Sequence, residues 1–173
     1  MQFRTKLTIP KNDNPIDYNS KIVSLGSCFA ENMARKLDYF KLQNICNPFG
    51  IIFNPVSIEK MIYRAVNQFF YTEKDIFFYN ERWHCYEVHS DLSNSDKEEF
   101  LENLNNVLKN LLTELLQASH IIITYGTSWV YRNLENNAVV ANCHKVPQKE
   151  FSKEILSVET IENSIKNTVG YIQ

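Results

Sequence analysis

The chain contains little glycine: four glycines occur among its 173 residues. Three of them, Gly26, Gly50 and Gly126, stand at or near the end of an apolar stretch and are followed by polar or aromatic residues. Glycine is favoured where the backbone needs a positive φ or must approach another segment closely. A chain this poor in glycine is expected to keep it where geometry demands it, so these three positions are the first candidates for a functional site.

The chain also lacks a signal peptide, a long hydrophobic run and an excess of charge of one sign. Residues 1–6 hold no apolar run or small-residue cleavage site, and no stretch is long enough to cross a bilayer. The formal net charge of −2 gives no broad attraction to nucleic acid or to an anionic membrane. The four cysteines include no CxxC pair, so we expect free thiols in a cytoplasmic protein.

The first half of the chain combines short strands with amphipathic helices. Hydrophobic residues make up 44% of the chain and charged residues 22%, as is typical of one globular domain. The apolar residues 21–25 predict a buried strand, and residues 29–37 predict a helix with Phe29 and Met33 on its apolar face. Between them lies a tight turn, so strand, turn and helix follow one another directly.

Further elements repeat this alternation. A helix is predicted over residues 57–70, with an apolar stripe that reaches Phe69, and short strands or an irregular insertion follow at residues 76–79 and 83–86. Ser95 and Glu98 form a capping-box pattern before a long apolar helix.

The second half of the chain continues the pattern. Residues 120–125 predict a strand, a hairpin is expected around residues 136–137, and Ser157 starts the last helix. The predicted fold is α/β, with a mostly parallel sheet flanked by helices, and ligands of such sheets bind at the carboxyl ends of the strands.

Four stretches in the same order resemble the GSCFA family. They are residues 25–32 (LGSCFAEN), 47–55 (NPFGIIFNP), 124–131 (TYGTSWVY) and 142–147 (NCHKVP), followed by Phe151. The first contains the pentapeptide Gly26-Ser27-Cys28-Phe29-Ala30 that gives the family its name. Several ordered matches that together span most of the chain make this resemblance specific.

The GSCFA family is similar to the SGNH hydrolases, which are esterases and acyl-group hydrolases or transferases. The resemblance implies a three-layer sandwich with the nucleophile on the turn after the first strand. Aligned without a gap on the Gly-Asp-Ser turn of those enzymes, Cys28 takes the place of the nucleophile; shifted by one residue, Ser27 takes it. A thiol is the better nucleophile, whereas hydrolases of this class use serine, so Ser27 and Cys28 both stay candidates.

The resemblance also implies an oxyanion site. Gly50 is the candidate N–H donor, and Asn54 is the residue that would orient its loop. Where the SGNH enzymes have Gly-x-Asn, this chain lacks the asparagine, so Ser128 or Asn142 would take its place. The candidate oxyanion or pocket residues are Gly50, Asn54, Gly126, Thr127, Ser128, Asn142, His144 and His89. For each of them a turn or a helix cap is the simpler alternative.

The largest departure from the family is at the C-terminus. The SGNH enzymes complete their catalytic triad with a late Asp-x-x-His, and GSCFA proteins have a similar motif in their C-terminal stretch. No Asp-x-x-His occurs in this chain. We therefore interpret residues 1–173 as a single GSCFA-type domain that lacks its C-terminal part. Such a chain is expected to be inactive alone, with its general base outside it and with a sheet edge free for self-association.

Three classes of function remain after these observations. The leading hypothesis is an acyl esterase or acyltransferase that acts on a small-molecule or saccharide-linked ester and needs no cofactor, nucleic acid or membrane. The second is a non-catalytic ligand- or carbohydrate-binding domain of the same fold. The third is a metal-binding protein that uses His84, Cys85, His89, Cys143 and His144, although their spacing matches no zinc finger and we assign no metal ligands.

Overall fold

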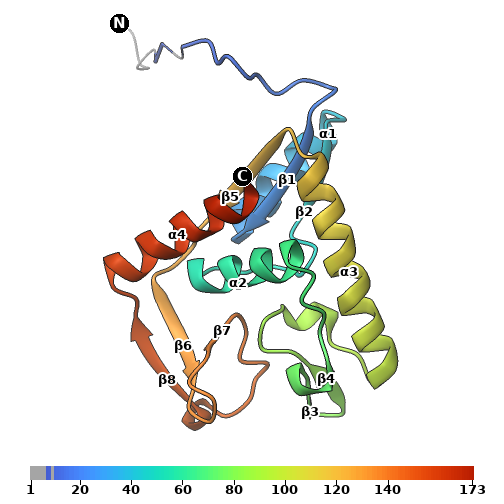
Figure 1. Ribbon diagram of the computed structural model, residues 1–173, viewed down its shortest axis with the longest axis vertical. Helices are drawn as coiled ribbons and strands as arrows, with labels where there is room; N and C mark the ends of the chain where they lie inside the picture. Colours follow the sequence, from blue (N-terminus) through green and yellow to red (C-terminus); the bar gives the residue numbers. More distant parts are fainter. Residues whose placement is uncertain (1–6, 9) are drawn as a thin grey trace, which may run out of the picture.

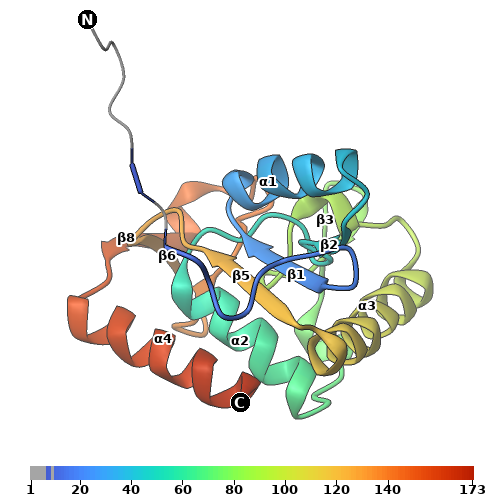
Figure 2. The same cartoon turned by 90° about the horizontal axis from the view of Figure 1, so that it is seen from above.

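A three-stranded parallel sheet forms the centre of the computed structural model, which describes residues 7–8 and 10–173. The strand order is β2-β1-β5 (Figures 1 and 2). β1 spans Lys21–Gly26, β2 spans Gln43–Cys46 and β5 spans His120–Thr124. The last residue of β1, Gly26, is in register with Thr124 at the end of β5. The predicted α/β class, with a parallel sheet between helices, is confirmed.

Helix α1 (Cys28–Tyr39) covers one face of this sheet (Figure 2). It buries Ala30 and Ala34, whose small side chains let the helix lie close to the strands. The prediction that Phe29 and Met33 form the buried face was wrong, because 59% of Phe29 and 41% of Met33 is exposed. The sequence spacing placed Phe29 and Met33 on one stripe of the helix. The stripe that packs against the sheet is the neighbouring one, which carries the alanines.

The opposite face carries α2 (Pro55–Val66) and α3 (Lys97–Gln117), and α4 (Val158–Ile172) packs against α2 (Figure 2). The main core lies between these helices and β1. Its large members include Val23, Leu25, Ile58, Ile62, Phe100, Leu104, Leu108 and Leu111. Burial of this continuous apolar surface supplies most of the driving force for folding.

Helix α2 is shorter than its sequence pattern predicted. It ends at Val66, and Gln68 then adopts a left-handed backbone with φ 54°. Phe69, expected on the buried stripe, lies outside the helix and is 54% exposed.

The helix caps were predicted with mixed success. Ser157 is the N-cap of α4, as predicted. The expected capping box of Ser95 is wrong by one residue, because the Asp96 carboxylate accepts the Glu99 N–H at 2.8 Å and caps α3 instead.

Two small antiparallel sheets lie below the parallel sheet in Figure 1. β3 (Phe77–Tyr79) pairs with β4 (Arg82–His84). β6 (Trp129–Asn133) pairs with β7 (Val139–Val140) and with β8 (Phe151–Ile155). The β6–β7 pairing confirms the predicted hairpin, whereas the sequence pattern did not reveal β8.

Candidate active site

Ser27 sits at the carboxyl end of β1, where it is the N-cap of α1. Its hydroxyl accepts a hydrogen bond from the Phe29 N–H at 3.3 Å and shares another with Thr124 Oγ1 at 2.9 Å. The Ser27 N–H donates to the Thr124 carbonyl oxygen at 3.0 Å. Only 6% of Ser27 is exposed. Ser27 is therefore held in place by the helix cap and by the end of β5.

Cys28 has a different environment, although it is the next residue. It is the first residue of α1 and is exposed. The first N–H groups of an α-helix have no intrahelical partner, so this end of α1 can hold an anionic group. Burial raises the pKa of Cys85 to about 12 and, with nearby acidic groups adding to it, that of Cys46 to about 11.

Gly26 is required by the close approach of β5. Its φ is +122°, and a methyl group added there would lie 2.1 Å from the Thr124 carbonyl oxygen. No other residue type fits this position without moving the backbone of β5. The glycine thus lets the end of β5 touch the turn that carries Ser27 and Cys28.

The loop of residues 47–54 wraps the other side of this turn. The Asn47 side chain accepts the Gly26 N–H at 2.7 Å, and the Ile52 N–H donates to the Gly26 carbonyl oxygen at 3.0 Å. The Gly50 N–H was expected to face a substrate oxygen. It instead closes a turn onto the Asn47 carbonyl oxygen at 2.7 Å, so this donor is already used in the structure.

Gly126 lies beside Ser27. A methyl group added to Gly126 would lie 3.2 Å from Ser27 Cβ and 2.7 Å from the ring of Phe53. The Gly126 N–H donates to the Phe53 carbonyl oxygen at 2.8 Å. The structure therefore brings Gly26, Gly126 and the loop that contains Gly50 to the same edge of the sheet.

Three other candidates have structural partners. Asn54 caps α2 by accepting the Ser57 N–H at 2.8 Å. The Thr127 hydroxyl accepts the Trp129 N–H at 2.9 Å. The Ser128 carbonyl oxygen accepts the Leu156 N–H at 2.8 Å, which leaves the Ser128 hydroxyl as the part of this residue that a substrate can use.

His144 is buried rather than placed at the mouth of the turn. Its Nε2–H donates to the Cys85 carbonyl oxygen at 2.7 Å. Its own N–H donates to the Asn142 side chain at 2.8 Å. Burial lowers the pKa of His144 to about 4, with His84 and His89 lowering it further and the Cys85 carbonyl oxygen opposing them.

His89 connects this second group of residues to the first. Its Nδ1 lies 3.1 Å from an Asp91 carboxylate oxygen, and its N–H donates to the Phe49 carbonyl oxygen at 3.0 Å. A methyl group on Gly50, whose φ is +75°, would lie 2.2 Å from His89 Cβ. Gly50 thus faces His89, while Ile52, two residues on, faces the turn.

Thr124 and Asn47 are site residues that the sequence did not reveal as such. Both hold the turn through short polar side chains from neighbouring segments. The signal for Thr124 was its position at the end of a strand, and that for Asn47 was the Asn-Pro pair. Only the register of β1 with β5 shows which turn they support.

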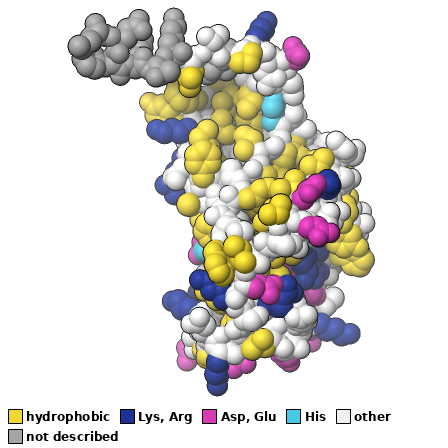
Figure 3. Space-filling view, turned by 90° about the vertical axis from the view of Figure 1, so that its left-hand side faces the viewer, with side chains coloured by type: hydrophobic (Ala, Val, Ile, Leu, Met, Phe, Trp, Pro, Cys, Tyr) yellow, Lys and Arg dark blue, Asp and Glu magenta, His cyan; other side chains and the backbone are white. Residues whose placement is uncertain are grey.

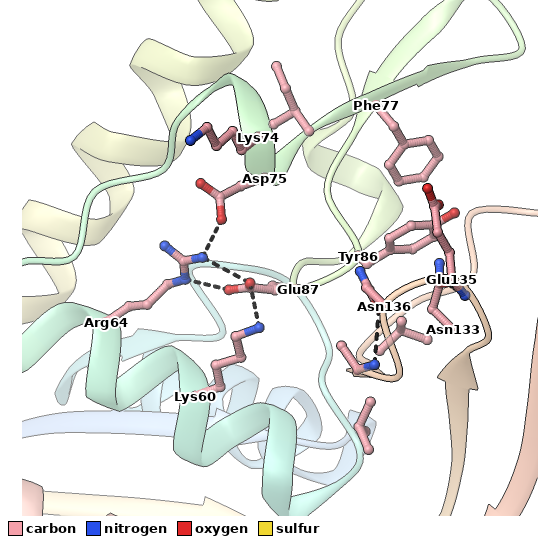
Figure 4. A pocket seen from close by; sticks show the side chains of 14 residues that line it. Lys60, Arg64, Lys74, Asp75, Phe77, Tyr86, Glu87, Asn133, Glu135 and Asn136 are labelled. Atoms are coloured by element: carbon pink, nitrogen blue, oxygen red, sulfur yellow. Dashed lines mark hydrogen bonds and ion pairs between the residues drawn. The ribbon is translucent and has the colours of Figure 1, made fainter.

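A separate cavity of about 620 Å³ lies between α2, the β3–β4 hairpin and the β6–β7 turn (Figure 4). Arg64 crosses its wall and binds two carboxylates, Glu87 at 2.6 Å and Asp75 at 2.5 Å. Lys60 also binds Glu87, at 2.8 Å. Burial opposes the charge of Arg64, but Glu87 and Asp75 outweigh burial and raise its pKa. The charges on this wall are thus largely matched within the protein.

The exposed thiol of Cys28 lies on a turn between the ends of two parallel strands and the N-terminus of a helix. The chain is therefore an α/β protein with a candidate nucleophile at the carboxyl edge of its parallel sheet. The profile of the GSCFA family matches residues 21–173, so the chain belongs to the GSCFA family. No curated protein and no solved structure matches it.

The described residues lack two further features, a membrane-spanning helix and a cluster of metal ligands. None of the helices they form is long and apolar enough to cross a membrane. No group of three or more His, Cys, Asp or Glu side chains among these same residues is arranged to hold a metal ion.

Proposed function

We propose that this chain carries acyl-transfer chemistry at the turn of residues 26–28, as hydrolysis or transfer of a small-molecule or saccharide-linked ester. The observation that carries the proposal is the contrast between two adjacent residues: Cys28 is exposed at the start of α1, and Ser27, the residue before it, is buried. Free thiols persist in the cytoplasm, which is where we place the reaction.

The thiol of Cys28 is the proposed nucleophile, and Ser27 is the proposed positioning residue. The Ser27 hydroxyl is already engaged by the Phe29 N–H and by Thr124, so using it as a nucleophile would break the helix cap. The Cys28 thiol loses no such contact when it attacks, and it is exposed at the start of α1.

The proposed reaction has two steps. The Cys28 sulfur forms a bond to the acyl carbon, the ester C–O bond breaks, and the alcohol leaves with a proton from a general acid. Water or a second alcohol then attacks the thioester and releases the thiol. The Cys28 N–H, together with the Ser128 hydroxyl or the Asn142 side-chain amide, would hold the oxyanion.

The proposed general base is a histidine outside the family motif. No Asp-x-x-His occurs in the 173 residues, so we expect slow turnover by this chain alone. His89, which Asp91 orients, is the stand-in that the chain offers, since His144 and His84 are buried with hydrogen bonds to carbonyl oxygens.

Hydrolysis of a p-nitrophenyl acyl ester with and without added imidazole tests the proposal. Imidazole can act as the general base, so it should raise the rate of ester hydrolysis more in the presence of the chain than in its absence. Cys28→Ala should lower the imidazole-dependent turnover roughly 10³-fold. Intact-mass analysis should detect an acyl adduct on Cys28. Cys143 is a second free thiol, and the control variant Cys143→Ala should behave as the unchanged chain does.

Two outcomes would contradict this assignment. An acyl adduct that forms in Cys28→Ala but not in Ser27→Ala would make Ser27 the nucleophile. Absence of any adduct or imidazole-dependent turnover, in a protein shown to be folded by circular dichroism, would favour the second candidate function, a ligand-binding domain. The cavity of about 620 Å³ away from the turn is the observation that favours that alternative, because its volume falls in the range of about 300–1,000 Å³ of small-molecule sites.

A further inference from the structure

Asn47 stands where the chain leaves β2 and the parallel sheet. β2 ends at Cys46, which is in register with Ser24 of β1. The next bond of this ladder is present, since the Asn47 N–H donates to the Ser24 carbonyl oxygen at 2.9 Å. In a parallel ladder that continued, the Gly26 N–H would then donate to the backbone carbonyl oxygen of Asn47. The last bond to the turn of residues 26–28 therefore depends on what residue 47 offers.

The side chain of Asn47 supplies this bond in place of its backbone. Asn47 Oδ1 accepts the Gly26 N–H at 2.7 Å, in a buried contact. The backbone carbonyl oxygen of Asn47 has turned away and accepts the Gly50 N–H at 2.7 Å. Asparagine and aspartate side chains replace backbone partners in this way at turns. The sheet thus keeps its last hydrogen bond while the chain leaves it.

Because the chain leaves the sheet at Asn47, the loop of residues 47–54 can reach round the turn. Further along this loop, the Ile52 N–H donates to the Gly26 carbonyl oxygen at 3.0 Å. The Phe53 carbonyl oxygen then accepts the Gly126 N–H at 2.8 Å. The N–H and the carbonyl oxygen of Gly26 are therefore both held by one loop, and Asn47 is its first residue.

The conformation of Asn47 limits which residue can do this. Its backbone is left-handed, with φ 43°, which asparagine tolerates better than most residues. Its Nδ2 is buried and has no hydrogen-bond partner among the described residues. The orientation of the amide is nevertheless fixed, since exchanging Oδ1 and Nδ2 would point a donor at the Gly26 N–H. Asparagine and aspartate are the residue types that combine this backbone with an acceptor so close to it.

We infer that Asn47 is a positioning residue for acyl transfer, which fixes the direction in which the turn of residues 26–28 presents its nucleophile. The inference rests on the proposed function. It holds whether Cys28 or Ser27 attacks, because Asn47 acts on the residue that precedes both. Asn47 is 9% exposed, so it acts through the Gly26 peptide group rather than on the substrate.

Two substitutions separate the side-chain acceptor from the backbone conformation. Asn47→Gly keeps the left-handed backbone, which glycine adopts readily, but removes the acceptor. Asn47→Asp keeps an acceptor in the same place. The kcat for imidazole-dependent hydrolysis of a p-nitrophenyl ester, per folded chain, should fall by about tenfold or more in Asn47→Gly, with little change in KM. Asn47→Asp should recover most of that loss.

Asn137→Gly is the matched control. Asn137 is also a left-handed asparagine, with φ 57°, and it is exposed in the connection between β6 and β7. Its replacement should leave kcat unchanged. Hydrogen exchange of the Gly26 N–H, followed by NMR, should be faster in Asn47→Gly than in the unchanged chain or in Asn47→Asp. This exchange rate reports on the hydrogen bond without requiring turnover.

Turnover of the unchanged chain separates this inference from the proposed function. If that chain forms an acyl adduct and hydrolyses the ester, an equal kcat in Asn47→Gly would overturn the inference alone. A loss that Asn47→Asp does not recover, or an equal loss in Asn137→Gly, would overturn it as well, because the acceptor would not be the cause. No adduct and no turnover in the unchanged chain would refute the proposed function and this inference with it.

Discussion

At the scale of single residues, the site depends on one glycine. Gly26→Ala places a methyl group 2.1 Å from the Thr124 carbonyl oxygen, at φ +122°. Because both the contact and the dihedral angle are unfavourable, the free energy of unfolding should fall by more than about 2 kcal/mol. Urea denaturation measures this change.

Gly170 provides the matched control for that substitution. It lies in α4, and a methyl group added there meets no atom within 4 Å. Gly170→Ala should therefore raise the free energy of unfolding by about 0.5–1 kcal/mol, since alanine is the better helix former. Equal effects of the two substitutions would show that the approach of β5 does not constrain residue 26.

At the scale of elements, the contact of α4 with α2 contains an unsatisfied hydroxyl group. Ser164 is 3% exposed and its Oγ has no hydrogen-bond partner among the described residues. Ser164→Ala removes this group and improves helix propensity, so it should stabilise the chain by about 1 kcal/mol. Thermal unfolding checks it, and a decrease in Tm would mean that the hydroxyl has a partner in solution.

The packing of the β3–β4 hairpin against the turn of residues 142–145 should depend on pH. His144 has its pKa lowered from 6.5 to about 4 by burial, so the unfolded chain binds the extra proton and the folded chain does not. Stability is then full above pH 6.5 and is lost as the pH falls toward 4. Between pH 7 and pH 5 the loss should be roughly 2 kcal/mol.

Urea denaturation at several pH values measures that loss. His84, whose pKa is also lowered, acts in the same direction. His144→Gln keeps an N–H donor for the Cys85 carbonyl oxygen but does not titrate, so its stability should vary less between pH 7 and pH 5. An unchanged slope in this variant would rule out His144 as the source.

The elements also show which parts of the structure could be predicted from sequence. The turn at Ser27 and Cys28 was placed correctly, because a strand, a glycine and a helix that follow one another leave little freedom. The buried face of α1 was not, because Ala30 and Ala34 face the sheet only once the helix packs against it. β8 was missed because its pairing with β6 is set by contacts distant in sequence.

The same limit applies to the candidate site. Gly126 was correctly assigned to the edge of the sheet near Ser27, since both follow parallel strands. The roles of His144 and Gly50 depend on which carbonyl oxygen or side chain folds against them. No local pattern in the sequence contains that information.

At the scale of the whole molecule, the two edges of the parallel sheet differ. β2 presents the polar residues Gln43 and Asn44, whereas β5 is built from three consecutive isoleucines. β5 pairs with β1, and no described strand lies on its other side. Figure 3 shows hydrophobic side chains gathered over the upper and middle parts of one face of the molecule. An apolar edge with unpaired backbone groups is a template for pairing with a second copy.

We therefore expect the 173-residue chain to self-associate through β5. Its net charge of −2 gives little repulsion between copies. Light scattering coupled to gel filtration should show a mass that rises above that of the monomer as the protein concentration increases. Ile122→Lys should restore the monomer, because a lysine on an edge strand opposes pairing. Side chains alternate along a strand, and Ile121 and Ile123 pack against the main core, so Ile122 is the position that spares it.

Ile122→Val should associate as the unchanged chain does. A monomer at every concentration, or a dimer that Ile122→Lys leaves intact in a folded protein, would show that the β5 edge is not the contact.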